Sequence, residues 1–305
     1  MIGRSIGSRI FDGFNYTFLG LMAFVTIVPF IYIVSVSFAE PEEVLRRGFI
    51  LFPTSFSLEG YKYIFSTGTI LQSLWITVGI TIAGTLINLL FTALLAYPLS
   101  RQDFSGRNLF MMLVVFTMLF NGGILPTFLV VKALGLLNTY WALLIPNAIS
   151  AFNLIVVVSF FRQLPEGLEE AAKIDGCNDF GLLFRIVLPL SAPVLATFAL
   201  FYAVGHWNTF FNAILYINDA DMWPIQVWLR QIVILSQGGI GDSTQFDHNY
   251  IAPPSQIIKM AVIVISTVPI LLVYPFLQKH FAKGVLLGSV KLIEFLPLAG
   301  GKAFT

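Results

Sequence analysis

The sequence has little charge and almost no cysteine. Of its 305 residues only 11% are charged, whereas soluble domains carry about 25%. The single cysteine, Cys177, excludes a disulfide framework and any metal site built on several cysteines. The three histidines, His206, His248 and His280, are scattered, and none has a second ligand at metal spacing. These absences argue against a soluble domain, a disulfide-bonded secreted protein and a metalloenzyme.

Apolar residues make up 57% of the chain and gather in long runs. A membrane-spanning helix needs about 20 mostly apolar residues, because every backbone polar group must be paired within the segment. Six stretches meet this requirement: 14–38, 70–97, 109–131, 140–161, 192–216 and 260–277. We therefore expect an all-α integral membrane protein with six transmembrane helices, in which residues 1–305 form a single transmembrane domain.

Lys and Arg are distributed unevenly between the connecting segments. Eleven of the 17 fall in one set of segments and six in the other. The larger set is Arg4, Arg9, Arg101, Arg107, Arg162, Lys173, Arg185, Lys279, Lys283, Lys291 and Lys302; the smaller is Arg46, Arg47, Lys62, Lys132, Arg230 and Lys259. Because basic residues concentrate on the cytoplasmic side, we expect both termini and segment 162–191 inside the cell. Segments 39–69 and 217–259 would then lie outside.

The six stretches contain no Asp, Glu, Lys or Arg. Ion-coupled transporters usually keep ionisable groups within the membrane, because protonating or pairing them couples ion to substrate. Their absence argues against a secondary transporter or a proton pump. Any energy source should act from outside the bilayer.

Amides and aromatic side chains supply the polarity of these stretches. Two interpretations stay open: hydrogen bonds between helices, worth about 0.6 kcal/mol each, or a polar path for a hydroxylated solute, with amides on hydroxyl groups and aromatic faces on sugar rings. The candidates for such a path are Asn88, Asn153, His206, Trp207, Asn208 and Asn212. Asn208 and Asn212 would lie one helical turn apart. His206 by itself is more typical of a buried, hydrogen-bonded histidine than of a proton carrier.

Segment 162–191 predicts a helix–turn–helix on the cytoplasmic side. Pro165 suits the start of the first helix, and Gly176 can end it in a left-handed conformation. Asn178 or Asp179 can cap the second helix. In that helix an apolar face recurs at i, i+3, i+4 and i+7, formed by Phe180, Leu183, Phe184 and Val187. The pair could lie flat on its own membrane surface, or it could dock into a groove of a soluble partner, with Ala171 and Ala172 as the short side chains that enter it.

A family resemblance favours docking. Glu170-Ala171-Ala172, three residues, Gly176, nine residues, Ile186, one residue and Leu188-Pro189 match the EAA loop of ABC importer permeases. The chain resembles the binding-protein-dependent permeases of the maltose (MalG) type. More narrowly it is similar to the branch for complex oligosaccharides such as aldouronate and pectin fragments. That narrower resemblance rests on the stretches beginning at Arg9, Asn121, Tyr202 and Met222, with Tyr274-Pro275-Phe276 and Lys283-Gly284-Val285.

The resemblance implies a set of partners: a second homologous permease, two ATPase subunits, an extracytoplasmic solute-binding protein and a carbohydrate substrate. ATP and Mg would bind to the ATPases and no cofactor to this chain, which has no Walker-type phosphate loop. The chain would be a non-catalytic subunit in the bacterial plasma membrane, and Ser100-Arg101 matches a cytoplasmic boundary of the family. The residues implied to couple to the ATPases are Glu169, Glu170, Ala171, Ala172, Lys173, Asp175, Gly176, Ile186, Leu188 and Pro189.

The chain departs from the resemblance at its end. Relatives of this branch usually end soon after the segment that corresponds to Gly288-Ser289-Val290-Lys291, whereas residues 292–305 continue here. No role follows for this extension. A stand-alone channel or facilitator remains the alternative to an importer permease. A membrane-embedded enzyme would need acid, base or metal ligands that the stretches do not offer.

Overall fold

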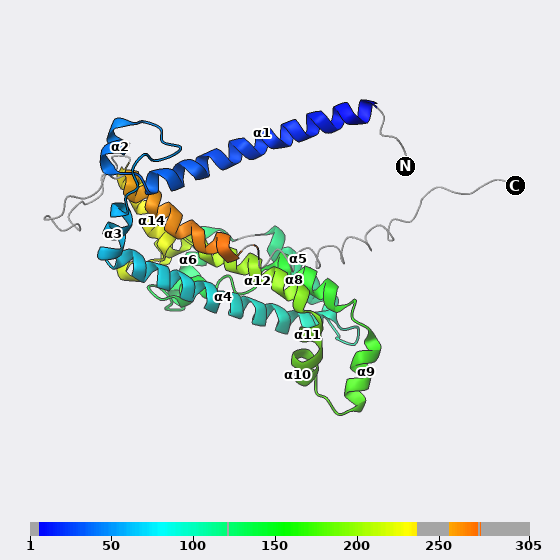
Figure 1. Ribbon diagram of the computed structural model, residues 1–305. Coiled ribbons are helices and arrows are strands. Elements are labelled where there is room, and N and C mark those ends of the chain that lie inside the picture. The colour runs from blue at the N-terminus through cyan, green and yellow to red at the C-terminus, as the bar shows by residue number, and fades with distance from the viewer. Residues whose placement is uncertain (1–5, 121, 237–255, 274, 276–305) are drawn as a thin grey trace. The chain divides into compact units, whose positions relative to one another are not determined.

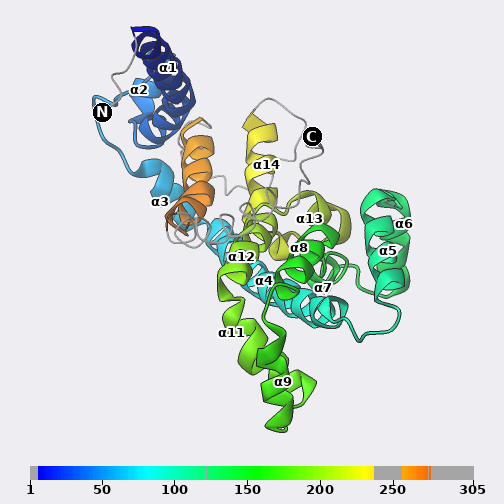
Figure 2. The same cartoon turned by 90° about the vertical axis from the view of Figure 1, so that its right-hand side faces the viewer.

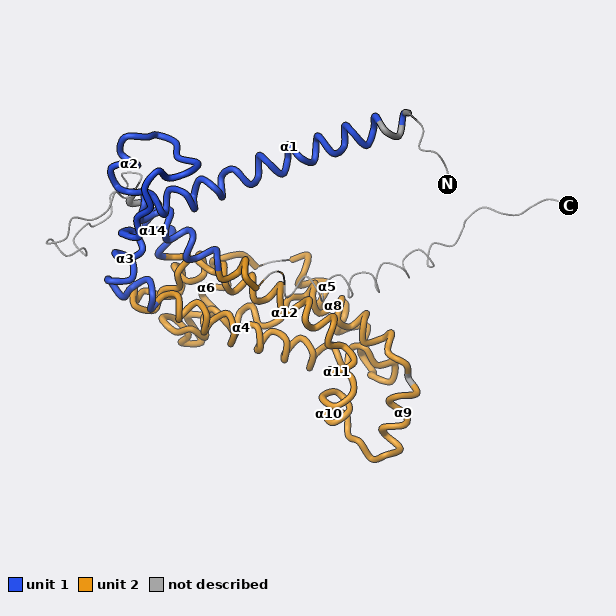
Figure 3. Tube along the Cα trace, in the orientation of Figure 1, with its two compact units in different colours: residues 1–72, 228–268 blue, residues 73–227, 269–305 orange. Residues whose placement is uncertain are grey.

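The computed structural model describes residues 6–120, 122–236, 256–273 and 275. Within these residues the regular structure is helical, apart from an isolated β-bridge between Ala39 and Phe56. The chain divides into two compact units (Figure 3). Unit 1 is Met1–Gln72 with Trp228–Val268, and unit 2 is Ser73–Val227 with Pro269–Thr305. The expectation of an all-helical chain is confirmed for the described residues.

Unit 1 contains the long helix α1 (Ile6–Ser37), followed by α2 (Pro41–Arg46) and α3 (Glu59–Ser66) (Figure 1). A small core of Val36, Ala39, Val44, Ile50 and Ile257 joins the end of α1 to the helix Gln256–Val273. A Cβ added at Gly60 would lie 2.6 Å from Ile257 Cγ2, so glycine allows α3 to approach this helix closely. Most side chains of α1 are exposed, as suits a helix surrounded by lipid or by another subunit.

The remaining helices lie wholly or partly in unit 2. They are α4 (Thr69–Ser100), α5 (Arg107–Leu119), α6 (Ile124–Ala133), α7 (Trp141–Leu144), α8 (Ala151–Phe161), α9 (Glu166–Ile174), α10 (Asp179–Leu182), the π-helix η1 (Leu183–Val187), α11 (Leu188–Leu190), α12 (Ala192–Trp207), α13 (Phe211–Tyr216), the 3-10 helix η2 (Ala220–Met222) and α14 (Ile225–Ser236). α4 begins, and α14 ends, in residues assigned to unit 1.

Two apolar clusters form the core of unit 2. The first includes Ala96 and Leu99 of α4, Val157 and Phe161 of α8, and Phe198 of α12. The second includes Ile80 of α4, Leu143 of α7, Tyr216 of α13 and Val227 of α14. Because α4 contributes to both clusters, it is the helix on which the rest of unit 2 is assembled.

Among the described residues, length and apolar composition identify three helices able to cross a membrane: Ile10–Ser37, Thr69–Ser100 and Gln256–Val273. Two bent helix pairs raise the number to five if each pair is one span: α5 with α6, which meet at 117°, and Asp179–Leu190 with Ala192–Trp207, which meet at 83°. The prediction of exactly six spans stays a prediction. Residues 276–305, including the extension 292–305 and the end of the predicted 260–277 span, lie outside the described residues.

Three of the stretches expected to be continuous are interrupted. Stretch 109–131 breaks before Gly123, which has φ +87°. In stretch 140–161 the break between α7 and α8 contains Pro146, whose missing N–H and bulky ring stop a helix. In stretch 192–216 the break follows Trp207, and α13 begins at Phe211. Apolar composition does not detect such breaks, because it measures length and hydropathy and not backbone geometry.

Candidate functional site

The elbow predicted within segment 162–191 is present. α9 ends at Ile174, and Gly176 takes φ +79°. Its N–H donates to the carbonyl of Lys173 at 3.0 Å, and the N–H of Cys177 donates to the carbonyl of Ala172 at 2.9 Å. These two bonds form a Schellman motif, which uses the last carbonyls of the helix. The left-handed glycine is thus confirmed, and it reverses the chain after α9.

The predicted coupling residues of α9 separate onto two faces. Glu170, Ala171, Lys173 and Asp175 are exposed, and Ile174 is 86% exposed. Ala172 is buried in the first core cluster of unit 2. Of the two alanines expected to enter a partner's groove, Ala171 is exposed, whereas Ala172 packs in the core of its own chain. The reason is helical geometry, since neighbouring residues point about 100° apart. The coupling role of both residues stays a prediction.

The second helix of the elbow begins as expected. Asn178 caps it, its side chain accepting a hydrogen bond from the N–H of Gly181 at 2.8 Å. The predicted apolar face is only partly correct. Leu183 and Val187 are buried, but Phe180 is 69% and Phe184 47% exposed, and Leu182 takes their place in the core.

A π-helical turn follows the start of this helix. Leu183–Val187 is π-helical, and the N–H of Leu188 bonds to the carbonyl of Leu183. The buried residues Leu182 and Val187 are five apart, the spacing of a π turn and not of an α turn. Pro189 follows directly and cannot donate to the carbonyl four residues before it, which favours the wider turn. Ile186 and Leu188 are partly buried against the core, while Pro189 is exposed.

Charged side chains connect α9 to the end of α4. Arg101 forms an ion pair with Glu169, and their side chains are 16% and 12% exposed. The Arg101 guanidinium also lies over the Tyr97 ring, 4.5 Å from its centroid. Arg162 donates from Nη2 to the carbonyl of Leu99 at 3.1 Å. Sequence reasoning placed Arg101 at a membrane boundary and missed this pairing. The only hint was a basic residue ending one span and two adjacent glutamates in a later loop.

Two of the predicted path residues bond to each other. Asn88 Oδ1 and His206 Nε2 lie 2.6 Å apart, and both side chains are buried. Asn88 also donates from Nδ2 to the carbonyl of Asn147 at 2.6 Å, in the break between α7 and α8. A Cβ added at Gly84 would lie 2.4 Å from His206 Nε2, so the ring packs directly on the α4 backbone. This group, Asn88, His206, Asn147 and Gly84, ties α4 and α12 to the break between α7 and α8.

The other path candidates do not join this group. Asn153 is buried at the start of α8, and Trp207 is buried at the end of α12. Asn208 is exposed, and its Nδ2 donates to the carbonyl of Val204 on its own helix at 2.9 Å. Asn212 is half-buried on α13. The path candidates thus fall into two sets. Asn88 and His206 join helices, whereas Asn208 and Asn212 are more accessible amides beyond the end of α12.

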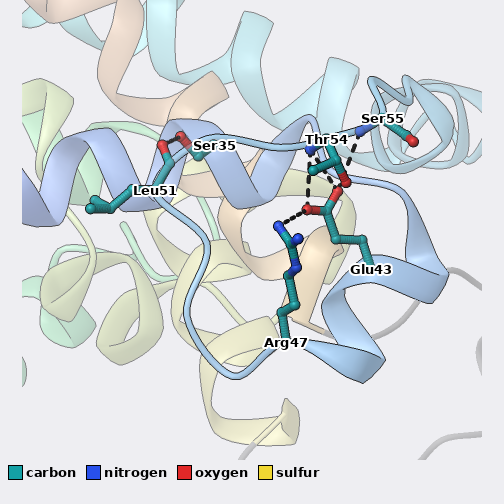
Figure 4. Close-up of polar contacts among 6 residues, drawn as sticks. All are labelled: Ser35, Glu43, Arg47, Leu51, Thr54 and Ser55. Carbon is teal, nitrogen blue, oxygen red and sulfur yellow. Dashed lines mark hydrogen bonds and ion pairs between the residues drawn. The ribbon is translucent and has the colours of Figure 1, made fainter.

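A buried carboxylate organises the loop after α2 (Figure 4). Glu43, 8% exposed, accepts hydrogen bonds from the N–H of Thr54 at 3.0 Å and of Ser55 at 3.4 Å. Arg47 Nη1 lies 3.0 Å from its other oxygen. Burial opposes the charged form, but these donors outweigh it, so the pKa of Glu43 lies below its ordinary value. Sequence reasoning missed this residue.

Within the described residues, no group of three or more His, Cys, Asp or Glu is placed to hold a metal ion. What the fold does define is a membrane protein of the permease class, with apolar helices joined by buried amides and an exposed helix–turn–helix attached to their core. The chain belongs to the family of binding-protein-dependent transport system inner membrane components, whose model matches residues 88–287. Members of this family are multi-pass, non-catalytic permease subunits of ABC importers.

Curated relatives cover nearly the whole chain. It is 58% identical to the polygalacturonan/rhamnogalacturonan transport system permease protein YtcP of Bacillus subtilis, over 93% of this chain and 99% of that one. It is 57% identical to protein LplC of the same organism, over 93% and 95%. A solved bacterial ABC transporter involved in the import of the acidic polysaccharide alginate has a similar fold, with TM-score 0.85 and 31% identity over 92% of this chain and 100% of that one.

Proposed function

We propose that this chain carries fragments of an acidic polysaccharide across the membrane, and that the elbow between α9 and α11 links its motion to ATP hydrolysis by partner subunits. The observation that carries the coupling role is the exposed face of α9: Glu170, Ala171, Lys173 and Asp175 stand free on a helix whose other face is fixed in the core. α9 lies beyond α11 and α12 in both views (Figures 1 and 2). It is thus accessible to a large partner.

The same attachment supports a mechanical role. Ala172, Leu182, Leu183 and Val187 belong to one core cluster with residues of α4, α8 and α12. Packed cores resist continuous deformation, so a push on α9 moves these helices together. Alternating access then follows as a rigid-body rocking, biased by whichever state the ATPases and solute bind more tightly.

The cargo is proposed from the relatives and from the chemistry of the spans. YtcP is named for polygalacturonan and rhamnogalacturonan, and the solved neighbour for alginate, and all three polymers contain uronic acids. The six predicted spans contain no carboxylate, so they present no like charge to an anionic sugar. Of the path candidates, the accessible amides of Asn208 and Asn212 are the proposed contacts, through hydroxyl–amide hydrogen bonds.

The remaining architecture is proposed with this function. Residues 1–305 form one permease domain with six spans and both termini in the cytoplasm. The complex contains a second homologous permease, two ATPase subunits that bind ATP and Mg, and a solute-binding protein outside. The elbow 162–191 is the EAA coupling loop, and the loops 39–69 and 217–259 face the binding protein.

Uptake by the reconstituted complex tests the proposal. The chain is purified with its co-expressed partner permease and ATPases, placed in proteoliposomes and supplied with the binding protein and labelled oligogalacturonides. We expect uptake that requires ATP and exceeds uptake of a neutral oligosaccharide of equal length. Downhill flux through the chain alone, without ATP or partners, would instead establish a channel or facilitator.

Gly176→Val tests the elbow. A β-branched residue at φ +79° costs at least about 1–2 kcal/mol and should displace α9. We expect loss of uptake and of solute-stimulated ATP hydrolysis, with normal membrane insertion, and the same from Glu170→Trp. Gly167→Ala on the same helix is the control, because a Cβ there meets nothing within 4 Å. Normal solute-stimulated ATP hydrolysis in Gly176→Val contradicts the coupling role.

A further inference from the structure

Two neighbouring carboxylates of α9 have different surroundings. The Glu169 side chain is 12% exposed and forms an ion pair with Arg101, whereas Glu170 is exposed. Residues i and i+1 of a helix do not face the same way. Glu169 and Ala172 are three apart and therefore share a face, the inner one. Of the two acids, only Glu170 is presented to a partner.

Arg101 is itself held in place at the end of α4. Its guanidinium lies over the ring of Tyr97, one helical turn earlier, at 4.5 Å. Its carbonyl accepts a hydrogen bond from Arg107 Nη1 at 3.2 Å. The neighbouring carbonyl of Leu99 accepts from Arg162. The segment that receives Glu169 is thus fixed by α4 itself, by the start of α5 and by the residue that follows α8.

From this arrangement we propose that the ion pair between Arg101 and Glu169 makes α9 move as one body with α4. Ala172 is one point of attachment, and a single small apolar contact leaves a helix free to swivel. The ion pair is the second point, on the same face, and two points fix the direction in which α9 lies. Glu169 is a positioning residue in this role, and Glu170 is the acid left for a cationic group of the partner. The proposal rests on the proposed coupling function.

The burial of the pair makes it testable by charge exchange. Exposed ion pairs contribute little. Removing one partner of a largely buried pair leaves an uncompensated charge, which is strongly unfavourable. Arg101→Glu and Glu169→Arg should therefore each be more damaging than both changes together, because the double variant restores opposite charges at one contact.

The readout is solute transported per ATP hydrolysed by the reconstituted importer. We expect a loss of about tenfold or more in each single variant, while the complex assembles and continues to hydrolyse ATP. The double variant should recover most of the loss. Lys132→Glu is the matched control: it makes the same change in charge at an exposed position at the end of α6, and should leave the ratio unchanged.

If the ion pair had a merely structural role, its loss would reduce assembly, ATP hydrolysis and transport together. The amount of solute transported per ATP hydrolysed would then stay unchanged. Single variants with a normal ratio overturn the proposal. So does an intact double variant that recovers nothing. If the unaltered complex shows no ATP-dependent uptake, the proposed function fails by itself, and the ion pair is then judged by a structural measurement.

That measurement is the distance distribution between spin labels at Ser105 and Gly167, both exposed, after Cys177→Ser. A Cβ at Gly167 meets no neighbour, so a label there should not disturb α9. We expect a broader distribution in Arg101→Glu and a return to the original width in the double variant. Equal widths in all variants overturn the proposal whatever the transport result.

Discussion

Glu43 is an acid that the surrounding backbone keeps charged. The N–H groups of Thr54 and Ser55 and the Arg47 guanidinium stabilise its carboxylate, and they lower its pKa although burial opposes this. A group whose pKa falls on folding stabilises the fold at pH values above its unfolded pKa. That contribution is lost as the pH falls through the lowered folded pKa. The loop after α2 should therefore be closed at neutral pH and open in acid.

Glu43→Gln should remove this dependence. The amide cannot carry the charge, and one of its terminal atoms is a donor that would face donors. We expect hydrogen exchange at Thr54 and Ser55 to become several-fold faster at neutral pH, and no longer to change with pH beyond the intrinsic rate. Mass spectrometry of the exchanged protein gives both quantities. Glu42→Gln is the control, since Glu42 is exposed and pairs with the equally exposed Arg46.

At the scale of elements, the helices of unit 2 are held together where they are interrupted. The break between α7 and α8 frees the carbonyl of Asn147, and Asn88 of α4 bonds to it. The same Asn88 bonds to His206 near the end of α12. Buried polar groups need partners in a membrane even more than in water. The freed carbonyl of Asn147 and the side chains of Asn88 and His206 therefore supply hydrogen-bond partners for one another.

Gly84→Ala should disturb this group. The added Cβ would lie 2.4 Å from the His206 ring, and the ring cannot move away without losing its hydrogen bond to Asn88. Overpacking of this kind costs about 1–3 kcal/mol. Thermal unfolding in nanodiscs should show a lower midpoint than for Gly79→Ala, a change on the same helix where a Cβ meets nothing. Equal midpoints would show that α4 and α12 separate easily here.

For the whole molecule, the decisive property is which side of the membrane each loop faces. From the excess of Lys and Arg we predict that segment 162–191 lies in the cytoplasm and segment 39–69 outside. After Cys177→Ser, a membrane-impermeant maleimide should label Gln163→Cys only in inside-out vesicles and Arg46→Cys only in right-side-out vesicles. Both positions are exposed. Labelling of Gln163→Cys from the outside would place the elbow out of reach of any ATPase and overturn the coupling proposal.

The sequence was most informative about features that depend on interactions between residues close together in the chain. The left-handed Gly176 was predicted correctly, and of the two caps predicted for the next helix, Asn178 and Asp179, the structure uses Asn178. Both features depend on residues a few positions apart. The apolar face predicted after Gly176 included Phe180 and Phe184, which are exposed, and missed Leu182, which is buried. The breaks at Pro146 and Gly123 were hidden by the apolar composition around them.

The sequence by itself determined that this is a membrane permease with a helix–turn–helix in segment 162–191, since apolar length and a short motif are properties of contiguous residues. Only the tertiary structure decided that Glu169 faces Arg101 while Glu170 faces outward, and that Asn88 meets His206 across 118 residues. The physical reason is that these contacts join residues far apart in the sequence. They form only when the helices that carry them pack against each other.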